Sequence, residues 1–187
     1  EIDLMLGHDS AMQLILEAMA TMAPSSSMPN AANLLVLAEA QLTNGVNLPY
    51  VAGPLLRTGL LDLPAGQPLL EADHRGIRAG DVVTFRLTSP THAGNNFLVV
   101  LSRNAVATAI GAPFHTTLAI GSDLLGLSLS MPALSGQLNA QGRAVFSLTV
   151  PAHLPWKTAY FAQAMILDSG NAAIAQTPPL ALRAERH

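Results

Sequence analysis

The chain has 187 residues, of which half are hydrophobic and 11% are charged, with no cysteine and a formal net charge of −3. This length allows one domain, or one domain with an appended segment. The composition excludes a disordered chain, a disulfide scaffold and a cysteine-ligated zinc site. The negative balance argues against nucleic-acid binding. Since no apolar run approaches the roughly 18 residues of a membrane span, no membrane-spanning segment is expected.

The low number of charged residues is the most unusual feature of the composition. The chain contains nine basic and twelve acidic residues, whereas about 25% of an ordinary soluble protein is charged. Two interpretations are open. Either a secreted protein uses Ser, Thr, Asn and Gln as its solvated face, or other copies or a parent domain cover part of the surface. Both interpretations fit the composition better than a free-standing cytosolic enzyme does.

Residues 10–22 are predicted to form an amphipathic helix. Ser10 and Gln13 have the spacing of a capping box, in which each side chain bonds the other residue's backbone. Large apolar side chains then recur at helical spacing, namely Met12, Ile15, Leu16, Met19 and Met22. This stripe either binds a partner through its pliable methionines or packs on the sheet of its own chain. With Leu4 and Leu6 it is the candidate intersubunit element.

The rest of the first 77 residues is less clear. Residues 33–42 satisfy both the helical and the strand period, so helix and buried strand both stay open. Pro49, Pro54, Pro64 and Pro68 then follow in close succession. Because proline breaks long elements, residues 46–78 are expected to form extended strands or loops. The first 77 residues are thus predicted to be a helix with an irregular extension.

From residue 78 onward, short apolar runs alternate with turns rich in Gly, Pro, Ser and Asn. Residues 81–89, for example, place Val83, Phe85 and Leu87 on one face and polar residues on the other. The other runs occupy residues 96–102, 116–120, 124–129, 136–139, 144–150, 160–167 and 180–183. So many short strands predict a mainly β fold over residues 78–187, a two-layer antiparallel β-sandwich of Ig-like or jelly-roll-like type.

One stretch carries a family resemblance. It comprises the turn sequence at residues 136–144, the Leu-Thr-Val-Pro of residues 148–151, and the Ala-Tyr-Phe-Ala-Gln-Ala of residues 159–164 with Asp168. These segments resemble a C-terminal β-sandwich module of bacterial secreted and surface proteins, over about residues 78–184. Here Asn139 stands at the position of the usual acidic residue of the turn, and Gly142 stands at the position of its glycine. Gln-Thr-Pro-Pro takes the place of a Ser-Asn-rich strand. The resemblance implies export and an accessory, attachment or assembly role.

No sequence pattern indicates catalysis or a bound cofactor. The six histidines show neither the i, i+4 nor the His-x-His spacing of a zinc site, and no Gly-x-Ser-x-Gly motif marks a nucleophilic serine. A hydrolase would need a histidine brought by the fold next to a serine or carboxylate. Asp62, Glu71, Asp73 and Asp81 cluster along the chain, with Arg75 and Arg78 between the last two. They suggest either a surface ion-pair network or a calcium site, although no calcium-loop motif is present.

Two aromatic residues suggest an alternative function. Trp156 is the only tryptophan, and Tyr160 follows it at the start of a predicted strand. Exposed rings in sandwich loops stack on sugars, which would make the protein a carbohydrate- or surface-ligand-binding module. The other interpretation is that Tyr160 packs in the core with its hydroxyl hydrogen-bonded. The leading prediction is a non-enzymatic, exported, self-associating surface or filament subunit or attachment module, without cofactor or metal, whose partners are copies of itself or a parent assembly.

Overall fold

The computed structural model describes residues 2–22, 27–44, 46–62, 66–152, 155 and 158–185. Contacts between Cα atoms divide the chain into two units, residues 1–64 and residues 65–187. The predicted boundary at residue 78 lies inside the second unit. The reason is that the strands β1 (Leu69–Ala72) and β2 (Gly76–Ile77) pair with later strands of that unit.

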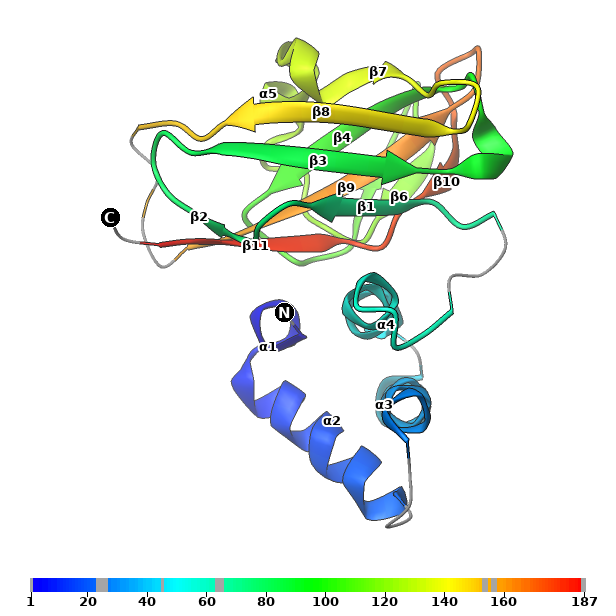
Figure 1. Cartoon of the computed structure of the whole chain (residues 1–187), viewed down its shortest axis with the longest axis vertical. Coiled ribbons are helices and arrows are strands. Elements are labelled where there is room, and N and C mark those ends of the chain that lie inside the picture. The colour runs from blue at the N-terminus through cyan, green and yellow to red at the C-terminus, as the bar shows by residue number, and fades with distance from the viewer. Residues whose placement is uncertain are drawn as a thin grey trace. The chain divides into compact units, whose positions relative to one another are not determined.

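Helices make up the described part of the first unit (Figure 1). They are α1 (Ile2–Leu6), α2 (His8–Thr21), α3 (Met28–Thr43) and α4 (Leu48–Arg57). Their shared core is made mostly of small and aliphatic side chains, namely Leu14, Ala18, Ala32, Ala38, Val51 and Leu55. The expectation of one helix and an irregular extension is therefore wrong for this part of the chain.

The ambiguous run at residues 33–42 is helical and lies within α3. The Ser27 side chain accepts a hydrogen bond from the Asn30 backbone N–H at 3.4 Å, and Pro29 occupies the first turn, where its missing N–H is not needed. Asn44 ends the helix in the left-handed conformation, with φ 55°. These end signals lie outside the ambiguous run, which is why the run alone does not decide its own structure.

Two local predictions in the first unit are wrong. The capping box does not form, because α2 begins at His8 with Gly7 before it, and Ser10 lies inside the helix. Residues 48–57, expected to be extended, form α4 although Pro54 lies within it. Pro49 occupies the first turn, where proline is compatible with a helix. Burial of Val51 and Leu55 outweighs the unfavourable proline at residue 54.

The second unit contains the strands of the chain, arranged in three sheets. The three-stranded sheet has the order β1-β3-β8, with β3 at Val82–Thr88 and β8 at Arg143–Thr149. The six-stranded sheet has the order β2-β11-β9-β4-β7, and β10 also pairs with β9. Its further strands are β4 (Asn96–Ser102), β7 (Ser135–Gln137), β9 (Ala159–Leu167), β10 (Ala173–Gln176) and β11 (Leu180–Ala184). The short strands β5 (Thr108–Ile110) and β6 (Thr116–Leu118) form a separate pair.

One hydrophobic core joins the three-stranded and six-stranded sheets (Figure 1). Phe85 of β3 stacks on Phe146 of β8 with ring centroids 5.3 Å apart, and Phe97 of β4 stacks on Phe146 at 5.5 Å. The alternation of Val83, Phe85 and Leu87 predicted this buried face correctly. Further core residues from β4, β9 and β11 include Val99, Ala162, Ala164, Ile166, Leu180 and Leu182.

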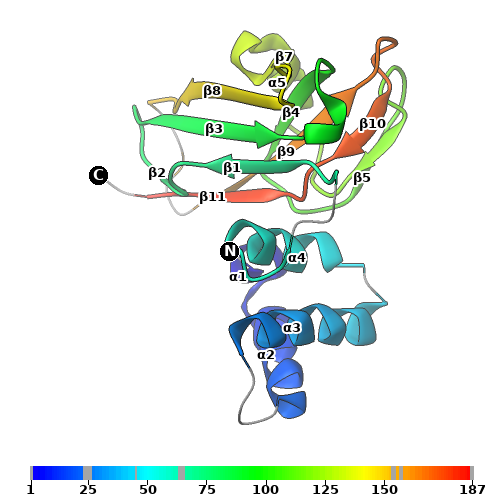
Figure 2. The same cartoon turned by 45° about the vertical axis from the view of Figure 1, so that its right-hand side comes forward.

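The opposite face of the six-stranded sheet is also buried. Every residue of β9 from Phe161 to Leu167 is buried, so both faces of this strand are covered. The helix α5 (Leu125–Ser130) lies against β4 (Figure 2). The Gln163 side chain of β9 accepts a hydrogen bond from the Ala119 backbone N–H at 2.9 Å. A plain two-layer sandwich would leave this face to solvent.

Residues 124–129 form α5 instead of the predicted strand. Leu125, Leu127 and Leu129 alternate with small residues, which gives the sequence a period of two. In the structure Leu127 and Leu129 are exposed, and only Ser128 of this helix is buried. The buried position is occupied by a hydroxyl, so the apolar alternation does not mark the buried face.

A turn quoted in the family resemblance forms as predicted. Asn139 Oδ1 accepts hydrogen bonds from the backbone N–H groups of Gln141 and Arg143, both at 2.9 Å. Gly142 adopts φ 69°, which favours glycine, and its carbonyl accepts from the Ser89 N–H at 2.7 Å. Asn139 thus provides the acceptor that an acidic residue would otherwise supply.

The fold as a whole is a mixture of helices and strands with several sheets. The six-stranded sheet is itself mixed, because β2 pairs parallel with β11 while β9 pairs antiparallel with β4 and β11. Two short 3-10 turns, η1 (Pro90–His92) and η2 (Pro132–Leu134), complete the described elements. Over the residues that the structure describes, no helix has the length and apolar character needed to cross a membrane.

Candidate functional site

The helix α2 presents a row of large apolar side chains to solvent. We call this row the α2 stripe; its members are Met12, Ile15, Leu16, Met19 and Met22. Leu16 and Met19 are each 60% exposed, and the other three are between 36% and 42% exposed. The side of α2 that is buried carries Ala11, Leu14 and Ala18 instead. The buried side of the helix thus consists of two alanines and one leucine, whereas most of its large apolar side chains face solvent.

The other two interface candidates behave differently from the stripe. Leu6 is half-buried and packs against the core of the helical unit. Leu4 belongs to α1, but its side chain lies outside the described residues. The structure thus places four of the stripe residues on one face of α2, with Met22 directly after the last residue of the helix, and leaves Leu6 half-buried.

The α2 stripe itself contains no charge. Asp9 and Glu17 are the only acidic residues of α2, and the helix contains neither lysine nor arginine. Two copies of the stripe could therefore meet without placing like charges directly opposite each other. Methionine side chains, which supply three of the five positions, adapt to an irregular partner surface.

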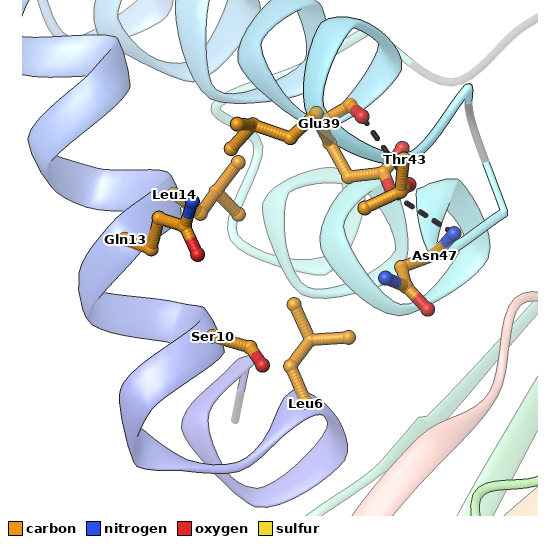
Figure 3. Close-up of a pocket in the computed structure, with 8 residues that line it drawn as sticks. Leu6, Ser10, Gln13, Leu14, Glu39, Thr43 and Asn47 are labelled. Atoms are coloured by element: carbon orange, nitrogen blue, oxygen red, sulfur yellow. Dashed lines mark hydrogen bonds between the residues drawn. The ribbon is translucent and has the colours of Figure 1, made fainter.

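A cavity of about 130 Å³ lies inside the helical unit, beside the buried Glu39 (Figure 3). Glu39 is 1% exposed. Its Oε1 accepts a hydrogen bond from the Asn47 backbone N–H at 2.9 Å and another from the Thr43 hydroxyl. Its Oε2 is buried without a hydrogen-bond partner. Sequence reasoning missed this residue, although Glu39 is the only charged residue of α3.

A wider groove of about 450 Å³ lies in the second unit, along β4 and β7. Its lining combines apolar side chains, including Phe97, Phe114 and Leu129, with the amides of Asn96 and Asn171. Phe97 and Phe114 are both almost fully buried, so they offer little ring surface on which a sugar could stack. The groove is open and has no charged residue in its lining.

The aromatic pair proposed for ligand binding is only partly described. Tyr160 lies on β9, is half-buried and packs against the core shared by the two sheets. Burial raises the pKa of the Tyr160 phenol, with the charge of Arg103 acting in the opposite direction. Trp156 lies outside the described residues. Tyr160 therefore agrees with the core-packing interpretation, whereas the ligand-binding role of Trp156 stays a prediction.

The carboxylates considered for calcium make local backbone contacts. Asp73 Oδ1 accepts from the backbone N–H groups of His74 and Thr84, at 2.9 and 3.1 Å, and lies 2.8 Å from His74 Nδ1. Asp81 Oδ2 accepts from the Arg78 N–H at 2.8 Å. Among the described residues, no group of three or more His, Asp or Glu side chains is arranged to hold a metal ion.

One histidine does meet a serine, as a hydrolase would require. His92 Nδ1 lies 2.8 Å from the Ser89 hydroxyl; Ser89 directly precedes the turn η1 and His92 is its last residue. Ser89 is fully buried, however, and neither residue lines either of the two cavities above. The contact of the buried Ser89 hydroxyl with His92, three residues later, stabilises this turn. We therefore assign the pair no catalytic role.

Comparison with known proteins gives only distant structural likenesses. No family model matches the chain, and no curated protein matches it. Among solved structures, the human F-spondin reeler domain is 12% identical, with a TM-score of 0.38 over 64% of this chain and 93% of that one. A PKD domain of an M14-like peptidase from a Thermoplasmatales archaeon is 14% identical, with a TM-score of 0.32 over 64% and 94%. WR4, a C. elegans MSP family member, is 10% identical, with a TM-score of 0.32 over 63% and 97%.

Proposed function

We propose that this protein is an exported, non-enzymatic assembly subunit whose copies associate through the α2 stripe. The single observation behind the proposal is the orientation of α2, which buries two alanines and one leucine and exposes most of its large apolar side chains. Exposed apolar patches of this kind mark interaction surfaces. The low charge of the whole chain supports the same interpretation, because a weakly charged surface favours association.

A second copy of this chain is the occupant that we assign to the stripe. In an isologous contact the same patch of both copies meets, so the patch must be complementary to itself. The α2 stripe meets this condition because it is uncharged and rich in flexible methionine. A partner selected by charge would instead require lysine, arginine or several carboxylates in the stripe.

The expected affinity is modest. The stripe exposes a few hundred Å², less than the ~800 Å² that each partner buries in a standard interface. We therefore expect a dissociation constant in the micromolar range or weaker. In a surface assembly, many such contacts act together, so weak individual contacts are sufficient.

We also propose that the second unit is the two-layer antiparallel sandwich module of the family resemblance, extended by α5 and by the parallel strand β2. The shared core of the two sheets supports this assignment. The module would present or anchor the helical unit at the cell surface. The carbohydrate-binding alternative rests on Trp156 and stays a prediction.

The proposal is tested by measuring the mass of the full-length protein by light scattering after size-exclusion chromatography. Loading concentrations should span the micromolar to millimolar range. Leu16→Glu places a charge in the middle of the stripe, at a position that is 60% exposed and so leaves the core intact. We expect the self-association dissociation constant of the variant to be at least about tenfold larger than that of the wild type.

The matched control is Gln41→Glu, which adds the same charge at an exposed position of α3, outside α2. This variant should associate like the wild type. A wild type that stays monomeric at the highest concentration would overturn the proposal. Equal weakening by both substitutions would also overturn it, because a general effect of charge would then explain the change.

A further inference from the structure

The buried carboxylate of Glu39 lacks a donor for one of its two oxygens. Oε1 bonds the Asn47 N–H and the Thr43 hydroxyl, which links the end of α3 to the start of α4. Oε2 has no partner although Glu39 is only 1% exposed. Leaving a carboxylate oxygen buried and unsatisfied is costly, so the site is incomplete as it stands.

The missing donor has room beside Glu39. The cavity of about 130 Å³ is lined by three leucines, Leu6, Leu14 and Leu42, and by polar side chains. Figure 3 shows Ser10 and Gln13 of α2 on the same side of the cavity as Leu6 and Leu14. Of the described residues that line the cavity, which also include Thr43 and Asn47, Glu39 is the only charged one. The described lining therefore offers a carboxyl group and contains no lysine or arginine.

We infer that this cavity binds a primary ammonium group carried on a short aliphatic stem. An ammonium group has three donors and a positive charge, and a charge-assisted hydrogen bond to a carboxylate is stronger than a neutral one. The aliphatic stem would pack against the leucine side chains of the lining. A water molecule or an ammonium ion without a stem would not cover these side chains. A divalent metal is disfavoured, since the part of the lining that the structure describes has a single carboxyl group, Glu39, and metals of this kind take several oxygen ligands.

The volume limits the size of the ligand. A protein cavity of about 150 Å³ holds one benzene molecule, which has six heavy atoms. A ligand of about six heavy atoms therefore fits here, for which n-pentylamine is a suitable probe. At neutral pH such an amine is protonated, as the lysine side chain is. None of the residues that line the cavity belongs to the α2 stripe, so binding is independent of the proposed self-association.

The experiment is a titration of the full-length wild type with n-pentylamine, followed by two-dimensional amide NMR. n-Pentanol serves as the neutral ligand of the same shape. We expect saturable binding of the amine near the millimolar range, as its small size implies, and at least about tenfold weaker binding of the alcohol. The largest shifts should fall on the amides of Thr43 and Asn47. A titration with a blocked lysine, Nα-acetyl-lysine methylamide, distinguishes a free amine from a lysine side chain as the natural source.

Glu39→Gln retains an oxygen for the Asn47 N–H and removes the charge. We expect it to weaken amine binding at least about tenfold. The matched control is Glu17→Gln, the same change at an exposed position of α2, which should bind like the wild type. Amine binding that survives Glu39→Gln would overturn the inference. Should that variant fail to fold, equal affinity of the wild type for amine and alcohol, or amide shifts outside the cavity, would overturn it independently.

Discussion

Asp123 is the residue that ties the segment after β4 to the sheet. Its Oδ1 accepts a hydrogen bond from the Ser102 hydroxyl at 2.6 Å, and its Oδ2 accepts from Arg103 Nε at 2.9 Å. Partial burial alone would raise the pKa of Asp123, but the hydrogen bonds from Ser102 and Arg103 outweigh it, so the pKa lies below its usual value. The folded state therefore favours the ionised carboxylate.

This network predicts an acid-sensitive contribution to stability. A carboxyl group with a lowered pKa stabilises the fold fully above its unfolded pKa of about 3.9, and loses that contribution as the pH falls through the folded pKa. Asp123→Asn should lower the free energy of unfolding by about 1–2 kcal/mol at neutral pH, since the side chain is partly exposed. The difference from the wild type should shrink below about pH 4.

Urea unfolding followed by circular dichroism at neutral and acidic pH measures this difference. Asp9→Asn, at an exposed position of α2, controls for the loss of one negative charge. A difference between Asp123→Asn and the wild type that stays constant with pH would contradict the network as the cause.

At the scale of elements, α5 hydrogen-bonds to β4 beyond the point where the pairing of β4 with β7 ends. β7 pairs with β4 only from Asn96 to Leu98. Further along the same strand, the Leu101 backbone N–H donates to the Ser128 hydroxyl at 2.9 Å, and that hydroxyl donates to the Leu124 carbonyl. A buried serine thus replaces a strand partner, and its back-bond keeps the helix in place.

Ser128→Ala should therefore destabilise the second unit by about 1–3 kcal/mol, because it leaves a buried backbone N–H without its acceptor. Ser130→Ala is the matched control on the same helix, where the hydroxyl is exposed and bonds only the Leu127 carbonyl. The control should cost less than about 0.5 kcal/mol. Chemical denaturation of both variants measures the two values, and equal values would show that Ser128 does not anchor α5.

At the scale of the whole molecule, the scarcity of charge determines how copies should associate. The α2 stripe is apolar, and the chain as a whole carries a net charge of only −3. Screening by salt weakens contacts between exposed charges but not apolar contacts. Raising sodium chloride from about 0.05 to 0.5 M should therefore leave the self-association constant unchanged or strengthen it. Sedimentation equilibrium at the two salt concentrations measures this, and association that falls with salt would point to a charged interface instead.

The sequence by itself predicted the strands whose pattern and surroundings agree. β3, β4, β8, β9 and β11 lie within one residue or so of their predicted positions. Each of these strands has either an alternating pattern or a continuous apolar run, and turn residues such as Asn139 and Gly142 bound them. The local sequence pattern and the packing of the tertiary core therefore both favour a strand at these positions. The absence of cysteine and the low charge were equally plain from composition.

Only the tertiary structure decided which apolar face is covered. Periodicity identified the stripe from Met12 to Met22 but could not show that Ala11, Leu14 and Ala18 face the core instead. It likewise read residues 124–129 as a strand, although a single buried serine anchors them as a helix. Glu39 had no sequence signal beyond its isolation in an uncharged helix. The reason is physical: a repeat in the sequence places side chains on one side of an element, whereas burial depends on which distant segment packs there.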